Sequence, residues 1–233
     1  AMDNHYGFWS GYGWKLRTCF IHDDQIEGGN LVIPANHGSG AWSAHYNSIL
    51  NLNMALKAMQ NGSLEGESPD KIDELMGEAK MIRGWNYFML VRMFGSLPLP
   101  TEETEDYYNA KLSRSPVSEV YDLIVNDFQD AIDLLPVSQQ PGEPTSDVAK
   151  ALLAKAYLTM ATYPMNDESY YSQAEKLTGE IIADSNYTLV EDINNVFSLE
   201  TEYGPEMMWG LYANASDRAI HPHVWSSIQG WGD

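Results

Sequence analysis

The chain of 233 residues has a single cysteine, few basic residues and no long apolar run. With Cys19 alone, no disulfide forms within the chain, and because its neighbours do not resemble a lipobox we expect a buried thiol. Thirteen Lys and Arg residues against 33 Asp and Glu residues give a formal net charge of −20. This balance excludes the basic footprint that a nucleic-acid backbone requires, disfavours adhesion to anionic headgroups and indicates a solubilising acidic surface.

Sequence signals of membrane spans, nucleophiles and metal centres are also missing. No apolar stretch approaches the ~20 residues of a spanning helix, and there is no Gly-rich phosphate loop, no G-x-S-x-G and no Cys/His pairing. The ranges 22–24 and 221–223 contain His and Asp, but neither supplies a third ligand at motif spacing. We therefore expect no metal and no cofactor, although a structural calcium ion would leave no mark in the sequence.

The middle of the chain is rich in helical periodicity. Apolar residues recur at steps of three and four, which predicts helices over 41–60, 69–94, 116–135, from about 145 onward, and over 169–183, with a short helix over 193–197. Ser68 and Pro69 form a typical helix start, Gly95 a typical exit, and Pro98 prevents continuation. The same serine-then-proline start is expected at Ser115. A strand is expected over 207–212.

These helices pair in succession across links with turn residues, as in TPR-type solenoids. The pair starts, near 41, 115 and 169, do not keep the ~34-residue TPR period, so the repeats are degenerate. The predicted fold is therefore mainly α, an α/α superhelix of TPR-like helical hairpins with irregular flanks. We expect a loop-rich N-terminal segment over 1–40, a helical core over 41–200 and the start of an irregular C-terminal region over 201–233.

One predicted helix carries a motif that resembles the motif of a known family. Glu78, Arg83, Gly84 and Tyr87–Phe88, followed by the range 94–99 (Phe-Gly-Ser-Leu-Pro-Leu), resemble the E-x-x-x-x-R-(A/G)-x-x-Y-F…(F/Y)-G-x-(L/V)-P-L motif of SusD/RagB proteins. Four further segments resemble motifs of this family in the same order, and they lie in the ranges 42–53, 114–136, 145–157 and 185–209. A resemblance in five successive segments is far more specific than any one of them.

The resemblance implies a non-catalytic surface lipoprotein of the outer membrane. Such a protein captures oligosaccharide or polysaccharide on the extracellular face and delivers it to a SusC-like TonB-dependent transporter, with an N-terminal lipid as its anchor. The chain has neither the signal peptide nor the lipid-bearing cysteine of the family, and it lacks the long C-terminal region that follows. It is therefore expected to be truncated at both ends.

Aromatic side chains on the two flanks are the candidate sugar platforms. Pyranose rings stack on Trp and Tyr while amides and carboxylates bind the hydroxyls, and the family places its ligand contacts in loops on either side of the helical block. The predicted glycan-binding residues are Trp9, Trp14, Asp24, Asn36, His37, Tyr212, Trp225 and Trp231.

Other residues of interest are assigned to the scaffold. Trp42 and Trp85 lie on predicted helices and are expected in the core, while Glu78 and Arg83 are expected to form structural ion pairs or to cap loops. Two alternatives stay open. A TPR-type protein–protein scaffold would bury the late tryptophans, and a glycoside hydrolase would need two placed carboxylates, which spacing does not single out.

Overall fold

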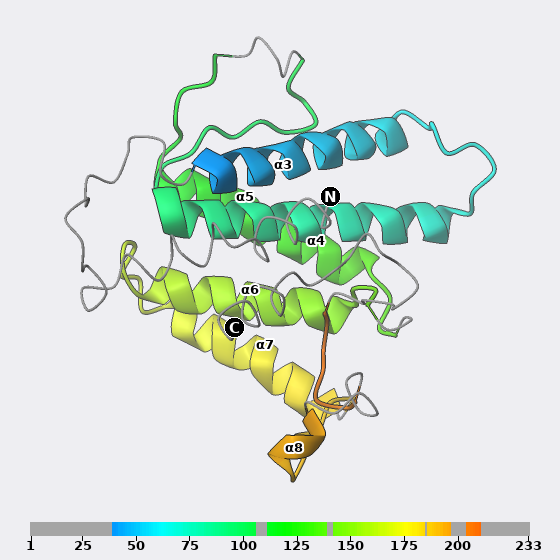
Figure 1. Ribbon diagram of the computed structural model, residues 1–233, viewed down its shortest axis with the longest axis vertical. Coiled ribbons are helices and arrows are strands. Elements are labelled where there is room, and N and C mark those ends of the chain that lie inside the picture. The colour runs from blue at the N-terminus through cyan, green and yellow to red at the C-terminus, as the bar shows by residue number, and fades with distance from the viewer. Residues whose placement is uncertain (1–38, 106–110, 139–141, 185, 197–203, 211–233) are drawn as a thin grey trace, which may run out of the picture. The chain divides into compact units, whose positions relative to one another are not determined.

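The fold is seen in a computed structural model that describes residues 39–105, 111–138, 142–184, 186–196 and 204–210. These residues form the helices α3 (Ser39–Gln60), α4 (Pro69–Phe94), α5 (Val117–Leu134), α6 (Ser146–Ala161), α7 (Tyr170–Asp184) and α8 (Ile193–Val196) (Figure 1). Within the described ranges there is no β-strand, only an isolated bridge between Leu97 and Ser115. The mainly α prediction is confirmed.

The chain divides into two compact units, and the boundary falls inside α3, between Asn51 and Leu52. In the smaller unit, the first half of α3 places Trp42 against Tyr46, with ring centroids 4.7 Å apart. The larger unit, Leu52–Tyr212, contains the rest of α3 and all the later helices. The predicted division at 40 and 200 stays a prediction.

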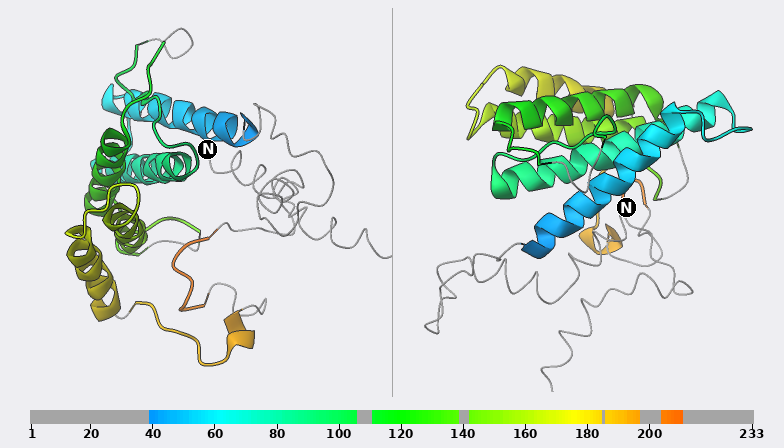
Figure 2. Two further views of the ribbon diagram at one scale, coloured as in Figure 1. Left: turned by 90° about the vertical axis from the view of Figure 1, so that its left-hand side faces the viewer. Right: turned by 90° about the horizontal axis from the view of Figure 1, so that it is seen from above.

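Successive helices pack on one another in the larger unit. Helix α4 packs on α5, α5 on α6 and α6 on α7 (Figures 1 and 2). The end of α3 joins this stack through Leu56, which packs in a cluster with Ala79 of α4. This arrangement is the predicted row of helical hairpins.

Helix α4 is buried over most of its circumference in its second half. Tyr87 and Leu90 have no exposed surface, and Phe88 is 2% exposed. Gly84 lets α5 come close, because a Cβ atom there would lie 3.1 Å from Cε1 of Phe128. Apolar residues therefore face neighbours on both sides, and the central helix is more widely buried than the single face that its periodicity predicts.

The helix ends follow the local signals with one exception. Ser68 accepts a hydrogen bond from the backbone N–H of Lys71 at 3.2 Å, and Gly95 adopts a φ of 68°, so α4 begins and ends as predicted. Ser115 is not a helix cap, and the prediction there is wrong. Pro116 is the N-cap of α5 and its side chain has no hydrogen-bond acceptor, while Ser115 pairs with Leu97 through its backbone.

Two smaller expectations are also corrected. Trp42 and Trp85 are partly exposed rather than fully buried. The described part of the expected strand, residues 207–210, forms no strand, because the N–H of Met207 donates to the carbonyl of Gly204 in a turn.

Candidate functional site

The predicted glycan-binding residues all lie outside the described residues. They are Trp9, Trp14, Asp24, Asn36 and His37 before α3, and Tyr212, Trp225 and Trp231 after Gly210. Their grouping into one site stays a prediction. The same holds for Cys19 and for the His-containing ranges 22–24 and 221–223.

The described residues contain a buried ion-pair cluster centred on Arg83 of α4. Its guanidinium donates to both carboxylate oxygens of Asp127 on α5, from Nε at 2.8 Å and from Nη2 at 2.7 Å. Nη1 donates to Oδ1 of Asn53 on α3 at 2.7 Å and also to the carboxylate of Glu102. One side chain therefore joins three helices and the loop after α4, as the structural assignment of Arg83 predicts.

Burial sets the electrostatics of this Arg83 cluster. Arg83 is 2% exposed and Asp127 is 1% exposed. Desolvation lowers the pKa of Arg83, but the hydrogen bonds and charges of Asp127 and Glu102 outweigh it and raise this pKa above the ordinary value. The pKa of Glu102 is lowered, because the attraction of Arg83 outweighs the effect of its partial burial. The charges pair with one another inside the helical stack, which agrees with the structural role expected for Arg83.

The same residues fix the base of the loop between α4 and α5. The carbonyl of Pro100 accepts from Nδ2 of Asn53 at 2.9 Å and from the hydroxyl of Tyr87 at 2.6 Å. Leu97 and Ser115 exchange backbone hydrogen bonds of 3.3 and 2.7 Å. Both legs of the loop therefore start from fixed points and leave the helices on the same side (Figure 1).

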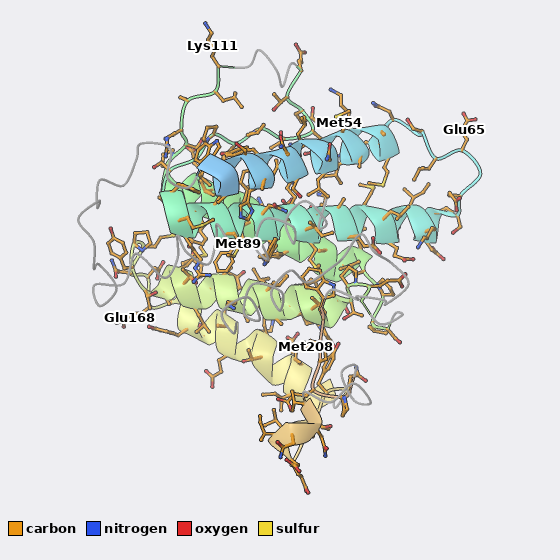
Figure 3. All side chains as sticks on the ribbon, in the orientation of Figure 1. Met54, Glu65, Met89, Lys111, Glu168 and Met208 are labelled. Carbon is orange, nitrogen blue, oxygen red and sulfur yellow. The ribbon has the colours of Figure 1, made fainter. Side chains whose placement is uncertain are left out.

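A second set of contacts fixes the segment that follows α8. The indole Nε1 of Trp209 donates to the carbonyl of Gly142 at 3.1 Å, and the Glu206 carboxylate accepts from the N–H of Val190 at 2.9 Å. Val190, Glu206 and Trp209 border a hollow of about 390 Å³ that is also lined by Met207 and Met208. Met208 is labelled in Figure 3. The start of the predicted C-terminal region is thus held at the N-terminal end of α6.

A groove of about 540 Å³ lies between α5, α6 and the start of α7. Tyr157 and Tyr170 stack at its base, with ring centroids 5.4 Å apart and planes 17° apart. Neither Tyr157 nor Tyr170 is among the predicted glycan-binding residues, because both lie on predicted helices where packing is the expected role. The one sequence signal that could have indicated this groove is the polar pair Asp122 and Asn126, which lie four residues apart on α5 and off its apolar face.

No group of three His, Cys, Asp or Glu side chains is placed to hold a metal within the described ranges. In the same part of the chain, no helix is both long and apolar enough to cross a bilayer.

Comparison with known proteins gives a consistent family match. The model of the SusD-like family described as "Starch-binding associating with outer membrane" matches residues 25–158. A SusD-like protein of Bacteroides ovatus is 27% identical over 182 residues, which cover 74% of this chain and 32% of that protein. The chain therefore spans about a third of the length of this curated relative.

Solved structures agree with the fold. A SusD superfamily protein from Parabacteroides distasonis superposes with a TM-score of 0.63 at 35% identity, over 69% of this chain and 34% of that one. A laminarin-binding SusD-like protein superposes with a TM-score of 0.63 at 26% identity, over 72% of this chain and 36% of that one. The TPR-like arrangement of α4 to α7 is thus shared with proteins of this family.

Proposed function

The chain belongs to the SusD-like family, and from this premise we propose that it binds oligosaccharide or polysaccharide at the outer membrane without cleaving it. The observation that carries the proposal is the family match over residues 25–158. This range contains the Arg83 cluster and the loop that the cluster fixes. The predicted site lies on the flanks, where Trp9, Trp14, Tyr212, Trp225 and Trp231 supply aromatic platforms.

We further propose a partner for this binding step. A lipid at the N-terminus of the whole protein holds it on the extracellular face, and the helical unit contacts a SusC-like TonB-dependent transporter that receives the glycan. The net charge of −20 disfavours a nucleic-acid ligand, which agrees with a sugar ligand and a protein partner.

Glycan binding is tested by affinity electrophoresis in gels that contain starch, laminarin or another neutral polysaccharide. We expect at least one polysaccharide to slow the protein, and we expect Trp225→Ala and Trp231→Ala to reduce this effect. Tyr163→Ala is the matched control, because Tyr163 is an exposed aromatic residue on the turn between α6 and α7 and is 82% exposed. If no polysaccharide slows the protein and the tryptophan variants only lower the melting temperature, the proposal fails and a protein scaffold is favoured.

Catalysis is tested separately by incubating the protein with each retained polysaccharide and measuring new reducing ends. We expect none above the buffer control. A steady release of reducing ends would replace the binding function with a glycoside hydrolase.

The partner is tested by affinity purification of the lipid-anchored protein from solubilised outer membranes. We expect a TonB-dependent transporter in stoichiometric amount. Its absence under conditions that retain other outer-membrane complexes would contradict delivery while leaving glycan binding intact.

A further inference from the structure

The groove between α5, α6 and α7 has an aromatic base formed by Tyr157 and Tyr170. Tyr157 is 5% exposed and Met160 is 1% exposed, while Tyr170 is partly exposed and its ring stacks on that of Tyr157. Gln129 donates to the hydroxyl of Tyr157 at 3.4 Å, which orients the lower ring. Burial raises the pKa of Tyr157, so the phenol stays neutral at physiological pH. The base is therefore preformed and uncharged.

The rim of the groove carries exposed polar side chains that can form hydrogen bonds with a ligand. Asp122 and Asn126 of α5 and Gln173 of α7 line the groove and are exposed. Within the described residues none of the three side chains has a hydrogen-bond or ion-pair partner. Together they offer one carboxylate and two carboxamides, which accept from and donate to neighbouring hydroxyl groups.

The lining also limits the class of ligand. Among the described residues no Lys, Arg or His side chain lines the groove, so a phosphate, sulfate or uronate group would meet Asp122 without a counter-charge from this lining. The exposed lining is mainly polar and offers no deep apolar pocket to anchor a peptide side chain. Tyr170, the partly exposed member of the stacked pair, lies beside a rim of two amides and one acid. This arrangement matches a neutral sugar, whose C–H face stacks while its edge hydroxyls form hydrogen bonds.

We propose that this groove is a second carbohydrate-contact site, on the helical core and separate from the aromatic flanks, and that it takes neutral hexose units of the bound glycan. The volume of about 540 Å³ lies in the range of small-molecule sites. The inference rests on the proposed function in taking a glycan as its ligand. The groove lies towards the end of α6 that leads into the turn marked by Glu168 (Figure 3). A long chain held at two places gains apparent affinity without new contacts at either.

The test uses the full chain, labelled with ¹⁵N, and neutral gluco-oligosaccharides of increasing length. We expect the side-chain amide signals of Asn126 and Gln173 to shift during the titration. The double variant Asn126→Ala/Gln173→Ala removes two rim groups and should weaken binding at the groove about tenfold. Gln60→Ala is the matched control, because Gln60 is an exposed amide at the end of α3. It should leave the groove shifts unchanged.

The outcomes separate this inference from the proposed function. If oligosaccharides shift other signals but none from α5 or α7, the groove is not a sugar site and the proposed function stands. If no sugar shifts any signal, both fail. If the double variant leaves sugar binding unchanged but abolishes co-purification of the transporter, the groove is a protein contact and the second sugar site is overturned.

Discussion

Arg83 illustrates, at the scale of single residues, how much the sequence reveals and where it stops. Its place in the motif indicated a structural ion pair. The sequence did not identify Asn53, Glu102 and Asp127 as its partners. These lie 30, 19 and 44 positions away, so only the packed helices bring them together.

Removing the guanidinium should be costly because it leaves Asp127 buried without a counter-charge. We expect Arg83→Met to lower the free energy of unfolding by about 3 to 5 kcal/mol. The double variant Arg83→Met/Asp127→Leu removes both charges and should recover part of that loss. Urea unfolding followed by circular dichroism measures both. The single variant Asp127→Leu completes the comparison. If the double variant loses as much free energy of unfolding as the two single variants together, the assignment of an ion pair is contradicted.

The charge of Glu78 is expected to lower the stability of the folded protein, whereas the paired charge of Arg83 is expected to raise it. It is partly buried and has no ion pair among the described residues, and burial, followed by the charge of Glu74, raises its pKa. A raised pKa means that the folded state holds the proton more tightly than the unfolded state. Ionisation therefore costs stability as the pH rises from the unfolded pKa through the folded pKa, and the cost persists at neutral pH.

We therefore expect Glu78→Gln to raise the free energy of unfolding at neutral pH by about 0.5 kcal/mol, a small value because solvent screens a half-exposed charge. The gain should vanish below about pH 3.5, where the glutamate is protonated in both states. Urea titrations at several pH values measure it, and Glu67→Gln at an exposed position is the control. A gain that grows towards acid pH would refute this reading.

At the scale of elements, the sequence predicts best those helices whose ends are determined by residues close to them in the chain. The bounds of α4 match the predicted 69–94, because Ser68, Pro69 and Gly95 act within one turn of the chain. Ser115 has the same local sequence, yet its backbone is used by Leu97 across the loop. Long-range pairing of this kind is not visible in a local pattern, so the sequence places the start of α5 within one residue but wrongly indicates Ser115 as its cap.

The contact between α4 and α5 depends on the absence of a side chain at position 84. A Cβ atom there would lie 3.1 Å from Phe128 and 3.2 Å from Asp127. We expect Gly84→Ala to destabilise the protein by about 1 to 3 kcal/mol through this overpacking. Gly179→Ala on α7 is the matched control: nothing lies within 4 Å of its Cβ position, so better helix propensity should stabilise by up to about 1 kcal/mol.

Thermal unfolding of both glycine variants gives the comparison directly. If both variants raise the melting temperature equally, α4 and α5 do not come into close contact at Gly84.

For the whole molecule, the sequence predicted the helical stack and the family but not how the later segment returns to it. Trp209 was recognised as part of a family motif. Its hydrogen bond to Gly142 crosses 67 positions and joins the segment after α8 to the start of α6. The groove was missed for a related reason, since Tyr157, Tyr170 and Asn126 come from three helices and form no motif along the chain.

Removing the indole donor should loosen this return segment. We expect Trp209→Phe to cost about 1 kcal/mol of stability. It should also speed amide hydrogen exchange at Thr188 and Val190, which donate to Pro205 and Glu206. Mass spectrometry of exchanged peptides measures this, with Tyr163→Phe on an exposed turn as the control. Unchanged exchange in the peptide that contains Val190 would mean that other contacts hold the segment.

The loop between α4 and α5 has a further consequence for engineering. Its two legs are joined at Leu97 and Ser115, and Pro100 is held from two helices, so the anchoring lies at the neck. For a flexible loop, each doubling in length costs only about 0.6 kcal/mol of closure entropy. We therefore expect a foreign peptide inserted between the two legs to leave the neck and the helices unchanged, so that this loop can carry new sequence without redesign of the helical stack.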